Sequence, residues 1–317
     1  MRNHAMDRSE LTRFVKDRAR AVGFDRVGVA AAGRARDAGR LRAWLEAGRH
    51  GEMAYLERHF EQRVDPRALL PGARSVVSVA LGYYTPHPGD GGPGCGKISR
   101  YAWGDDYHDI VKERLFALRR ALEAAVPGLR ARCCVDTAPI LEKYWAVAAG
   151  IGWLGKHGCV ITPECGSWVF LGELVLDCEL DADAPLPDRC GTCRRCLEAC
   201  PTGALAAPSR LDATRCLSYW TIESRADCFP PDIRRALDGR IFGCDICQEV
   251  CPWNRKLAQT TPLVAFAPRL DNMNRPLREL LSMDEPTFRR RFRSSPVRRA
   301  KWPEFVRNLL EAAASGA

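Results

Sequence analysis

Two runs of cysteine in the second half of the chain have the spacing that binds iron–sulfur clusters. The first reads Cys-x2-Cys-x2-Cys-x3-Cys-Pro from Cys190 to Pro201, and the second reads Cys-x2-Cys-x3-Cys-Pro from Cys244 to Pro252. In bacterial two-cluster ferredoxins, the cysteine before the proline ligates the other cluster. With Cys216 as the remaining member of the second run, the sequence predicts two [4Fe–4S] clusters and transfer of single electrons.

This pattern assigns four cysteines to each cluster. The first cluster takes three cysteines of the first run and the last of the second: Cys190, Cys193, Cys196 and Cys251. The second cluster takes the others: Cys200, Cys216, Cys244 and Cys247. The alternatives are zinc and disulfides. Zinc sites usually combine two Cys-x2-Cys pairs, and disulfide frameworks are typical of small secreted domains, so the iron–sulfur interpretation is favoured.

Length and composition exclude several classes of protein. A chain of 317 residues is expected to form two or three domains. Its 15 cysteines indicate a reducing compartment, so a cytoplasmic location is expected. The first twenty residues lack the apolar core of a signal peptide, and no apolar run approaches about 18 residues, so neither export nor a membrane span is expected.

The region before the clusters predicts an α+β domain. The pair Asp7 and Glu10 has the spacing of a capping box at the start of a helix. Hydrophobic patterning predicts further helices over 37–47, 107–126 and 139–149, and strands over 25–31, 75–81, 130–136, 158–162 and 167–176. We therefore expect an α+β domain over 1–180, a ferredoxin-like domain over 181–255 and a basic helical region over 256–317.

The C-terminal region combines positive charge with aromatic residues. Between Arg289 and Arg307, eight lysines and arginines stand against one glutamate. Phosphate contacts and base stacking require such residues, so an RNA-binding role is predicted for Arg298, Arg299, Lys301, Trp302 and Arg307. A solvated amphipathic helix is the alternative.

Four motifs outside the clusters are rich in glycine, aromatic and polar residues. They are HGEMAYL at 50–56, KISRYAWGDDYH at 97–108, VDTAPILEK at 135–143 and GIGWLGKH at 150–157. Together with the cysteine runs and CPWNR at 251–255, they make the chain resemble the epoxyqueuosine reductase family from about residue 10 to 310.

The resemblance implies an activity, cofactors and partners. It implies a monomeric, cobalamin-dependent oxidoreductase with two [4Fe–4S] clusters, which reduces epoxyqueuosine to queuosine in the anticodon loop of tRNA. This is the last step of queuosine synthesis, and it needs an unidentified low-potential electron donor. The family fold that it implies is a cobalamin-binding α+β domain, a ferredoxin-like domain and C-terminal helices.

The resemblance also implies a catalytic role for Asp136. The clusters reduce cobalt to Co(I), which attacks the epoxide, and Asp136 protonates the oxygen. From the residues alone, Asp136 or Thr137 could instead cap the helix that follows. A carboxylic acid that is protonated near neutral pH needs a raised pKa, and we expect burial beside the corrin to raise it.

Further residues are carried over as cobalamin contacts where they match the family motifs: Arg63, Ser99, Arg100, Tyr101, Asp136, Val160, Leu171 and Ser218. Val160 and Leu171 are expected as backbone or packing contacts, and surface ion pairs are the alternative for the two arginines. His108 lacks the Asp-x-His-x-x-Gly context of a cobalt ligand and is expected to be structural or on the substrate side. Lys156 and His157 are either substrate contacts or ordinary polar residues.

Two other functions compete with this interpretation. A cobalamin-dependent reductive dehalogenase has a similar cluster layout, but such enzymes usually carry a twin-arginine export signal, which the first residues do not show. A non-catalytic eight-iron electron carrier needs only about 60 residues around its clusters, which leaves about 180 residues before them unexplained.

Overall fold

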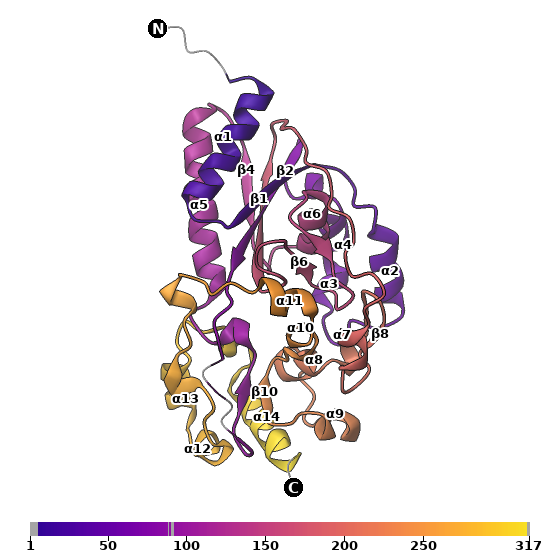
Figure 1. Ribbon diagram of the computed structural model, residues 1–317, viewed down its shortest axis with the longest axis vertical. Coiled ribbons are helices and arrows are strands. Elements are labelled where there is room, and N and C mark those ends of the chain that lie inside the picture. Colours follow the sequence, from indigo (N-terminus) through magenta and orange to yellow (C-terminus); the bar gives the residue numbers. More distant parts are fainter. Residues whose placement is uncertain (1–5, 88, 90–91, 316–317) are drawn as a thin grey trace.

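A four-stranded antiparallel sheet lies at the centre of the N-terminal half of the chain (Figure 1). The computed structural model describes residues 6–87, 89 and 92–315. The order of the strands is β1 (Arg26–Ala31), β2 (Ser75–Gly82), β7 (Val169–Leu176) and β4 (Ala131–Cys134). Every residue of β2 is buried, because both faces of the sheet are covered.

Helices cover the two faces of this sheet. Helices α1 (Arg8–Ala21) and α5 (Tyr107–Ala125) pack on one face, and α6 (Glu142–Ala148) packs on the other. The alternation of β2 explains this arrangement, since Val77 and Val79 join the core beneath α1 and α5 while Val76 and Ala80 join the core beneath α6. The predicted capping box is present, with Asp7 accepting a 2.8 Å hydrogen bond from the backbone N–H of Glu10.

Short elements connect and extend these layers. The remaining helices before the cysteine runs are α2 (Ala38–Glu46), α3 (Tyr55–Arg58) and α4 (Phe60–Val64), and β5 (Trp153–Leu154) pairs with β6 (Val160–Ile161). The cluster segment holds α7 (Arg195–Glu198), β8 (Leu205–Ala207), β9 (Arg210–Leu211), α8 (Leu217–Ile222), α9 (Pro231–Arg235), β10 (Arg240–Phe242), α10 (Ile246–Glu249) and α11 (Pro252–Leu257). The C-terminal helices are α12 (Leu277–Leu281), α13 (Glu285–Arg291) and α14 (Trp302–Ala314). The described residues also contain six short 3-10 turns: Pro66–Ala68, Arg100–Ala102, Ala213–Arg215, Val264–Phe266, Leu270–Asn272 and Pro296–Arg299.

The C-terminal helices share a hydrophobic core with two earlier parts of the chain. Strand β3 (Lys97–Ile98) pairs in parallel with β10, and both lie beside α14 (Figure 1). Phe305 and Leu309 of α14 are fully buried in one cluster with Ile98, Trp103 and Phe242. The region 256–317 is therefore packed against residues near 100 and near 240, which sequence patterning did not predict.

Three expected elements are shorter than predicted, and one of them is the strand expected over 130–136, which is observed as β4. The helix expected over 139–149 begins at Glu142, because the backbone of Leu141, with a φ of −84° and a ψ of 73°, lies outside the helical region. The strand expected over 158–162 is reduced to β6, since Gly158 has a φ of +83°. Within the described residues, no helix combines the length and the apolar character needed to cross a membrane.

Candidate active site and cluster centres

A cavity of about 1650 Å³ lies between the sheet domain and the cluster segment. Pockets for drug-sized ligands measure roughly 300–1,000 Å³, so this cavity has room for a larger molecule. Five of the residues predicted as cofactor contacts line it: Arg63, Ser99, Tyr101, Asp136 and Ser218. The four cysteines assigned to the second cluster also line it, so the cavity borders that cluster directly.

Arg63 brings an unpaired buried cation to the cavity wall. Its side chain is 7% exposed, and its Nε has no hydrogen-bond partner in the described structure. One terminal nitrogen makes a long contact of 3.5 Å with the carbonyl of Tyr55. Burial lowers the pKa of Arg63. A buried guanidinium needs acceptors, so this residue fits a ligand that carries carbonyl or phosphate oxygens, and the surface ion pair considered above is wrong.

Arg100 and Ser99 occupy different environments although they are adjacent. Ser99 donates to the buried carboxylate of Asp245, which also accepts the backbone N–H of Arg100 at 2.6 Å. The guanidinium of Arg100 is 6% exposed and donates to the carbonyl of Thr85. Three aromatic rings enclose it, those of Tyr84, Trp103 and Trp168. Arg100 is not among the described residues that line the cavity, and its role as a cofactor contact stays a prediction.

Val160 and Leu171, which the resemblance suggests as backbone or packing contacts of the cofactor, are core residues. They are 2% and 8% exposed, and both belong to the hydrophobic core beneath α6. Neither is among the described residues of the cavity wall. Their side chains pack under the sheet because each lies on the strand face that α6 covers.

Asp136 projects into the cavity from the turn after β4. Its φ is +39°, a conformation that few residues other than glycine adopt and that aspartate tolerates. The carboxylate accepts from Nε2 of His108 at 2.9 Å, and Nδ1 of His108 lies 2.7 Å from the carboxylate of Asp106. Since α6 begins only at Glu142 and Asp136 bonds to His108, the helix-cap alternative is wrong.

The start of α5 orients this pair. Asp106 caps α5 through a 3.0 Å bond from the backbone N–H of His108, so the first turn of the helix directs the imidazole toward Asp136. The ring of Tyr107 stacks on His108 at 4.2 Å, which fixes the plane of the imidazole. His108 is thus held between two carboxylates.

The protonation states of Asp136 and His108 differ from the expectation that Asp136 carries the proton. Burial opposes ionisation of Asp136, but the hydrogen bonds of His108 and Tyr107 outweigh burial and lower its pKa. Burial also opposes protonation of His108, but the two carboxylates prevail and raise its pKa to about 9. At neutral pH the proton therefore resides on His108. The prediction of a raised Asp136 pKa is wrong, because the sequence did not reveal the contact with His108.

Two further ionisable residues of the cavity wall had no predicted role. Glu142 and Lys143 line the cavity beside Asp136. Burial, followed by the charge of Asp136, raises the pKa of Glu142 to about 7. Both residues belong to the motif at 135–143, so their place in that motif is the signal that could have identified them.

The cysteine thiols form two neighbourhoods. Burial and then the charges of Cys251, Cys190 and Cys193 raise the pKa of Cys196 to about 11. Around the cavity, burial raises the pKa of Cys247, with Cys159, Cys244 and Cys216 adding to it. Burial likewise raises the pKa of Cys216, and the charge of Cys200 contributes.

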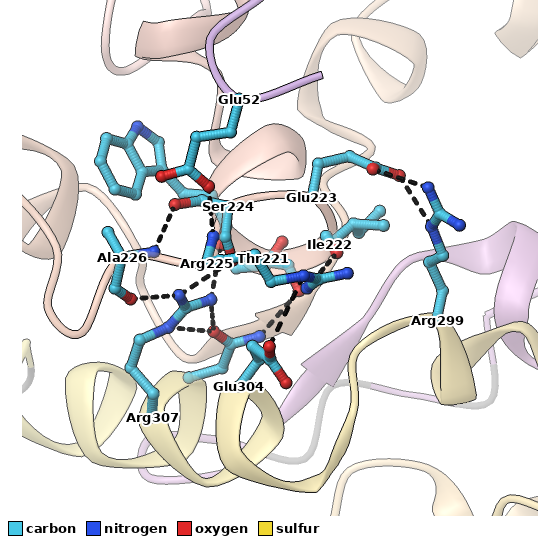
Figure 2. Close-up of polar contacts among 12 residues, drawn as sticks. Glu52, Thr221, Ile222, Glu223, Ser224, Arg225, Ala226, Arg299, Glu304 and Arg307 are labelled. Atoms are coloured by element: carbon cyan, nitrogen blue, oxygen red, sulfur yellow. Dashed lines mark hydrogen bonds and ion pairs between the residues drawn. The ribbon is translucent and has the colours of Figure 1, made fainter. Parts of the chain in front are cut away.

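The predicted RNA contacts are divided between the surface and the interior. Arg298, Arg299 and Lys301 are exposed, and Arg299 pairs with Glu223 at 2.9 Å (Figure 2). Trp302 is half-buried against the ring of Phe288.

Arg307 points from α14 into the loop 221–226, as Figure 2 shows. It is 8% exposed and donates to the carbonyls of Ser224 at 3.0 Å and Trp220 at 2.9 Å. Its guanidinium holds this loop against α14 and cannot reach a phosphate. The structure therefore corrects the predicted RNA contact at Arg307.

Comparison with known families identifies two regions of the chain. Residues 63–137 match the family described as epoxyqueuosine reductase QueG, DUF1730. Residues 189–254 match the 4Fe-4S double cluster binding domain. The first region ends just after Asp136, and the second contains all eight assigned cysteines.

Whole-chain comparisons agree with these matches. The epoxyqueuosine reductase of Synechocystis sp. is 47% identical over 273 residues, which cover 86% of this chain and 93% of the relative. That of Gloeobacter violaceus is 46% identical over 305 residues, 94% of either chain. A crystal structure of epoxyqueuosine reductase superposes with a TM-score of 0.88 at 33% identity, covering 96% of this chain and 82% of the other.

A second solved structure is that of an epoxyqueuosine reductase with an epoxyqueuosine-modified tRNA-Tyr stem loop. It matches with a TM-score of 0.87 at 32% identity, over 96% of this chain and 81% of the other. These relatives exceed 30% identity over nearly the whole length of the chain, and the matched regions contain both the cavity wall at Asp136 and the cysteine runs. The chain therefore belongs to the epoxyqueuosine reductase family, with a double [4Fe–4S] cluster-binding domain at residues 189–254.

Proposed function

We propose that this chain reduces epoxyqueuosine to queuosine in tRNA, with cobalamin in the large cavity and electrons from two [4Fe–4S] clusters. The observation that carries the proposal is the cavity itself, which Asp136 and four cluster cysteines line together, with His108 bonded to Asp136 behind the wall. The relatives named as epoxyqueuosine reductases support the substrate, as does the relative solved with an epoxyqueuosine-modified stem loop. The net reaction adds two electrons and two protons to the epoxide and releases water.

The cluster ligands follow from the spacing and from the two thiol neighbourhoods. We assign Cys190, Cys193, Cys196 and Cys251 to the first cluster and Cys200, Cys216, Cys244 and Cys247 to the second. The second cluster borders the cavity, so it is the immediate electron donor to a cofactor bound there, and the first cluster accepts electrons from an external low-potential donor.

The residues of the cavity fit cobalamin. The unpaired guanidinium of Arg63 would bind an amide or phosphate oxygen, while Ser99, Tyr101 and Ser218 would contact the corrin and its side chains. Bound there, cobalamin would supply a strong cobalt nucleophile for an epoxide carbon. The protein's own contribution is to exclude water, hold the cofactor beside the cluster and deliver protons.

Asp136 delivers the proton to the epoxide oxygen, and His108 supplies it. At neutral pH the proton resides on His108, 2.9 Å from the carboxylate, so a short transfer loads Asp136 when the oxygen becomes basic. Asp106 keeps His108 in place through the opposite ring nitrogen. This arrangement replaces the isolated, raised-pKa acid that the sequence suggested.

The basic surface at the C-terminal region would contact the RNA backbone. Arg298, Arg299 and Lys301 are exposed there. Arg299 lies near the ring of Tyr55, a residue of the cavity wall, which places a cation close to the opening of the site. Phosphate contacts at this position would guide a modified anticodon loop toward Asp136.

Anaerobic turnover tests the proposal directly. The protein is loaded with cobalamin and both clusters, reduced chemically and supplied with tRNA that contains epoxyqueuosine. Mass spectrometry of the digested nucleosides should show the loss of one oxygen, and this loss should require cobalamin. If the tRNA stays unchanged although corrinoid and clusters are bound, the proposed reaction is wrong.

A further inference from the structure

The loop that carries the first cysteines of the cluster segment is flanked by arginines. Arg189 precedes Cys190, and the pair Arg194 and Arg195 follows Cys193. The three arginines are exposed and these two cysteines are partly exposed, whereas the other two ligands assigned to the first cluster are buried. The edge of the first cluster that lies nearest to solvent is therefore at this loop, between positive charges.

Helix α11 adds two more cations beside the loop. Arg255 and Lys256 are exposed on this helix, and the indole of Trp253 donates to the carbonyl of Arg189 at 3.1 Å, which joins the helix to the start of the loop. The ammonium group of Lys156 holds the loop from the other side, since it donates to the carbonyl of Cys193 at 2.8 Å. We refer to the five exposed cations as the cluster face: Arg189, Arg194, Arg195, Arg255 and Lys256.

The positive charges of the cluster face are largely unpaired. Within the described residues, its only ion pair joins Arg194 to Glu198 at 3.7 Å. These two side chains are 63% and 68% exposed, so water screens the pair and it contributes little. Arg255 donates to a backbone carbonyl at 3.1 Å, which leaves its charge without a counterion. The cluster face is therefore free to attract an anionic partner.

The acidic linker before the loop does not neutralise these cations. Its residue Asp183 pairs with Lys16 of α1 at 2.6 Å. Its residue Glu179 pairs with Arg74 at 2.7 Å. Asp188, which lies next to the loop, accepts a backbone N–H at 2.8 Å. The negative charge of the linker is thus held mainly against the sheet domain, and the cluster face keeps an excess of positive charge.

The cluster face surrounds the cluster that is farther from the cavity. The four cysteines assigned to the second cluster line the cavity, whereas those assigned to the first cluster are not among the described residues of its wall. Electrons from an external carrier therefore enter at the first cluster and leave through the second. Because the rate of electron transfer falls steeply with distance, the carrier has to dock over the exposed loop.

We infer that the cluster face is the docking site of a small acidic protein that carries one electron at low potential. The inference rests on the proposed function, since it names the class of partner that reduces the clusters. A cluster held by four thiolates is negatively charged, so it repels an acidic carrier unless cations surround the contact. Complementary charges steer such encounters, and electron-transfer complexes use small interfaces. The carrier loses one electron, the first cluster gains it, and no bond forms or breaks.

RNA is the other polyanion that this surface could attract. Trp253, the aromatic residue of α11, packs edge-on against Trp153 at 5.2 Å and donates to the loop, so it is not free to stack on a base. None of the five cations is among the described residues that line the cavity, where the modified base has to react. These observations favour a protein carrier, and RNA binding becomes an outcome of the test.

The rate at which a carrier reduces the full chain with both clusters tests the inference without tRNA. Reduced flavodoxin serves as the acidic one-electron carrier, and stopped-flow absorbance follows its oxidation as its concentration and the salt are varied. The radical cation of methyl viologen is a second reductant, which is small and needs no docking site. The variants are two double charge reversals, Arg194→Glu with Arg195→Glu and Arg255→Glu with Lys256→Glu.

A third double charge reversal, Arg13→Glu with Arg120→Glu, is the matched control. Both arginines are exposed and have no ion pair within the described residues. They lie on α1 and α5, which pack on the sheet domain rather than on the cluster segment (Figure 1). The control therefore changes the net charge of the protein by the same amount but leaves the cluster face intact.

Each double variant of the cluster face should lower the second-order rate constant with flavodoxin by about tenfold or more at low salt, because electrostatic steering is reversed. Rising salt should slow the wild type and narrow this difference. The control should react like the wild type, and reduction by methyl viologen should not slow in any variant.

The inference is wrong if neither variant slows flavodoxin, if the control slows it equally, or if methyl viologen slows as well. Weaker tRNA binding by the variants, with flavodoxin unaffected, would also overturn it and assign the cluster face to RNA. Should one double variant fail to assemble its clusters, the other decides alone. Because no tRNA is present, a failure of epoxyqueuosine reduction would leave these rate constants unaffected.

Discussion

Replacing Asp136 by asparagine should lower the pKa of His108 and weaken its hold on the proton. His108 lies between the carboxylates of Asp136 at 2.9 Å and Asp106 at 2.7 Å, and together they raise its pKa from 6.5 to about 9. Asparagine preserves the shape and the acceptor oxygen but lacks the charge. Because burial acts against protonation, the remaining carboxylate cannot hold the pKa near 9, and we expect a fall of at least about one pKa unit.

The rise in the pKa of His108 also gives the free energy by which its contacts with the two carboxylates stabilise the fold. One pKa unit corresponds to about 1.36 kcal/mol, so the rise from 6.5 to about 9 corresponds to about 3 kcal/mol. The side chain of Asp136 is 48% exposed, so solvent screening reduces the net contribution to about 2 kcal/mol. Since the folded-state pKa is raised, this stabilisation is fully present below pH 6.5 and is lost as the pH rises through about 9.

Nuclear magnetic resonance of the imidazole groups measures the pKa directly. The chain has six histidines, and His108→Gln identifies the signal of interest. Urea unfolding of the wild type and of His108→Gln should differ by about 2 kcal/mol near pH 6, and the difference should vanish above about pH 9.5. His59→Gln, at an exposed position, serves as the control. A wild-type His108 that titrates near 6.5, or one that Asp136→Asn leaves unchanged, would refute the reasoning.

Four further outcomes are expected from the loaded protein. Asp136→Asn should retain both clusters and cobalamin but lose turnover by about 10²–10⁴-fold, and near-normal rates would remove Asp136 from the mechanism. Cys200→Ser and Cys216→Ser should damage the same cluster, and resonance signals lost from different clusters would overturn the assignment. Arg63→Met should weaken cobalamin binding by about tenfold, because a charge-assisted hydrogen bond is lost, whereas unchanged affinity would place Arg63 outside the cofactor site. If about 4–6 phosphates are contacted, log affinity for tRNA should fall with log salt at a slope of roughly −3 to −5, and a flat response would exclude the basic surface.

The spacing of residues along the sequence was enough to identify the features that depend on residues close together in the chain. The capping box at Asp7 and Glu10 is present, and the helix expected over 107–126 is observed as α5. Strand β2 follows from its run of small and branched apolar residues. The cysteine spacing pointed to a double cluster domain, which the family comparison confirms for residues 189–254. In the capping box, in the strand and within each cysteine run, the determining residues lie within a few positions of one another.

The tertiary structure decided the chemistry of individual side chains. Asp136 and His108 are 28 positions apart in sequence, so only the fold shows that they share a proton. Arg100 was predicted to contact the cofactor and Arg307 to contact RNA, but aromatic rings enclose the first and backbone carbonyls bind the second. Burial and charge partners set a pKa and determine whether a cation is free to bind, and these partners come from distant parts of the chain. The sequence alone therefore predicted the class of cofactor and the class of fold. Packing determined which side chains can contact a cofactor or a substrate.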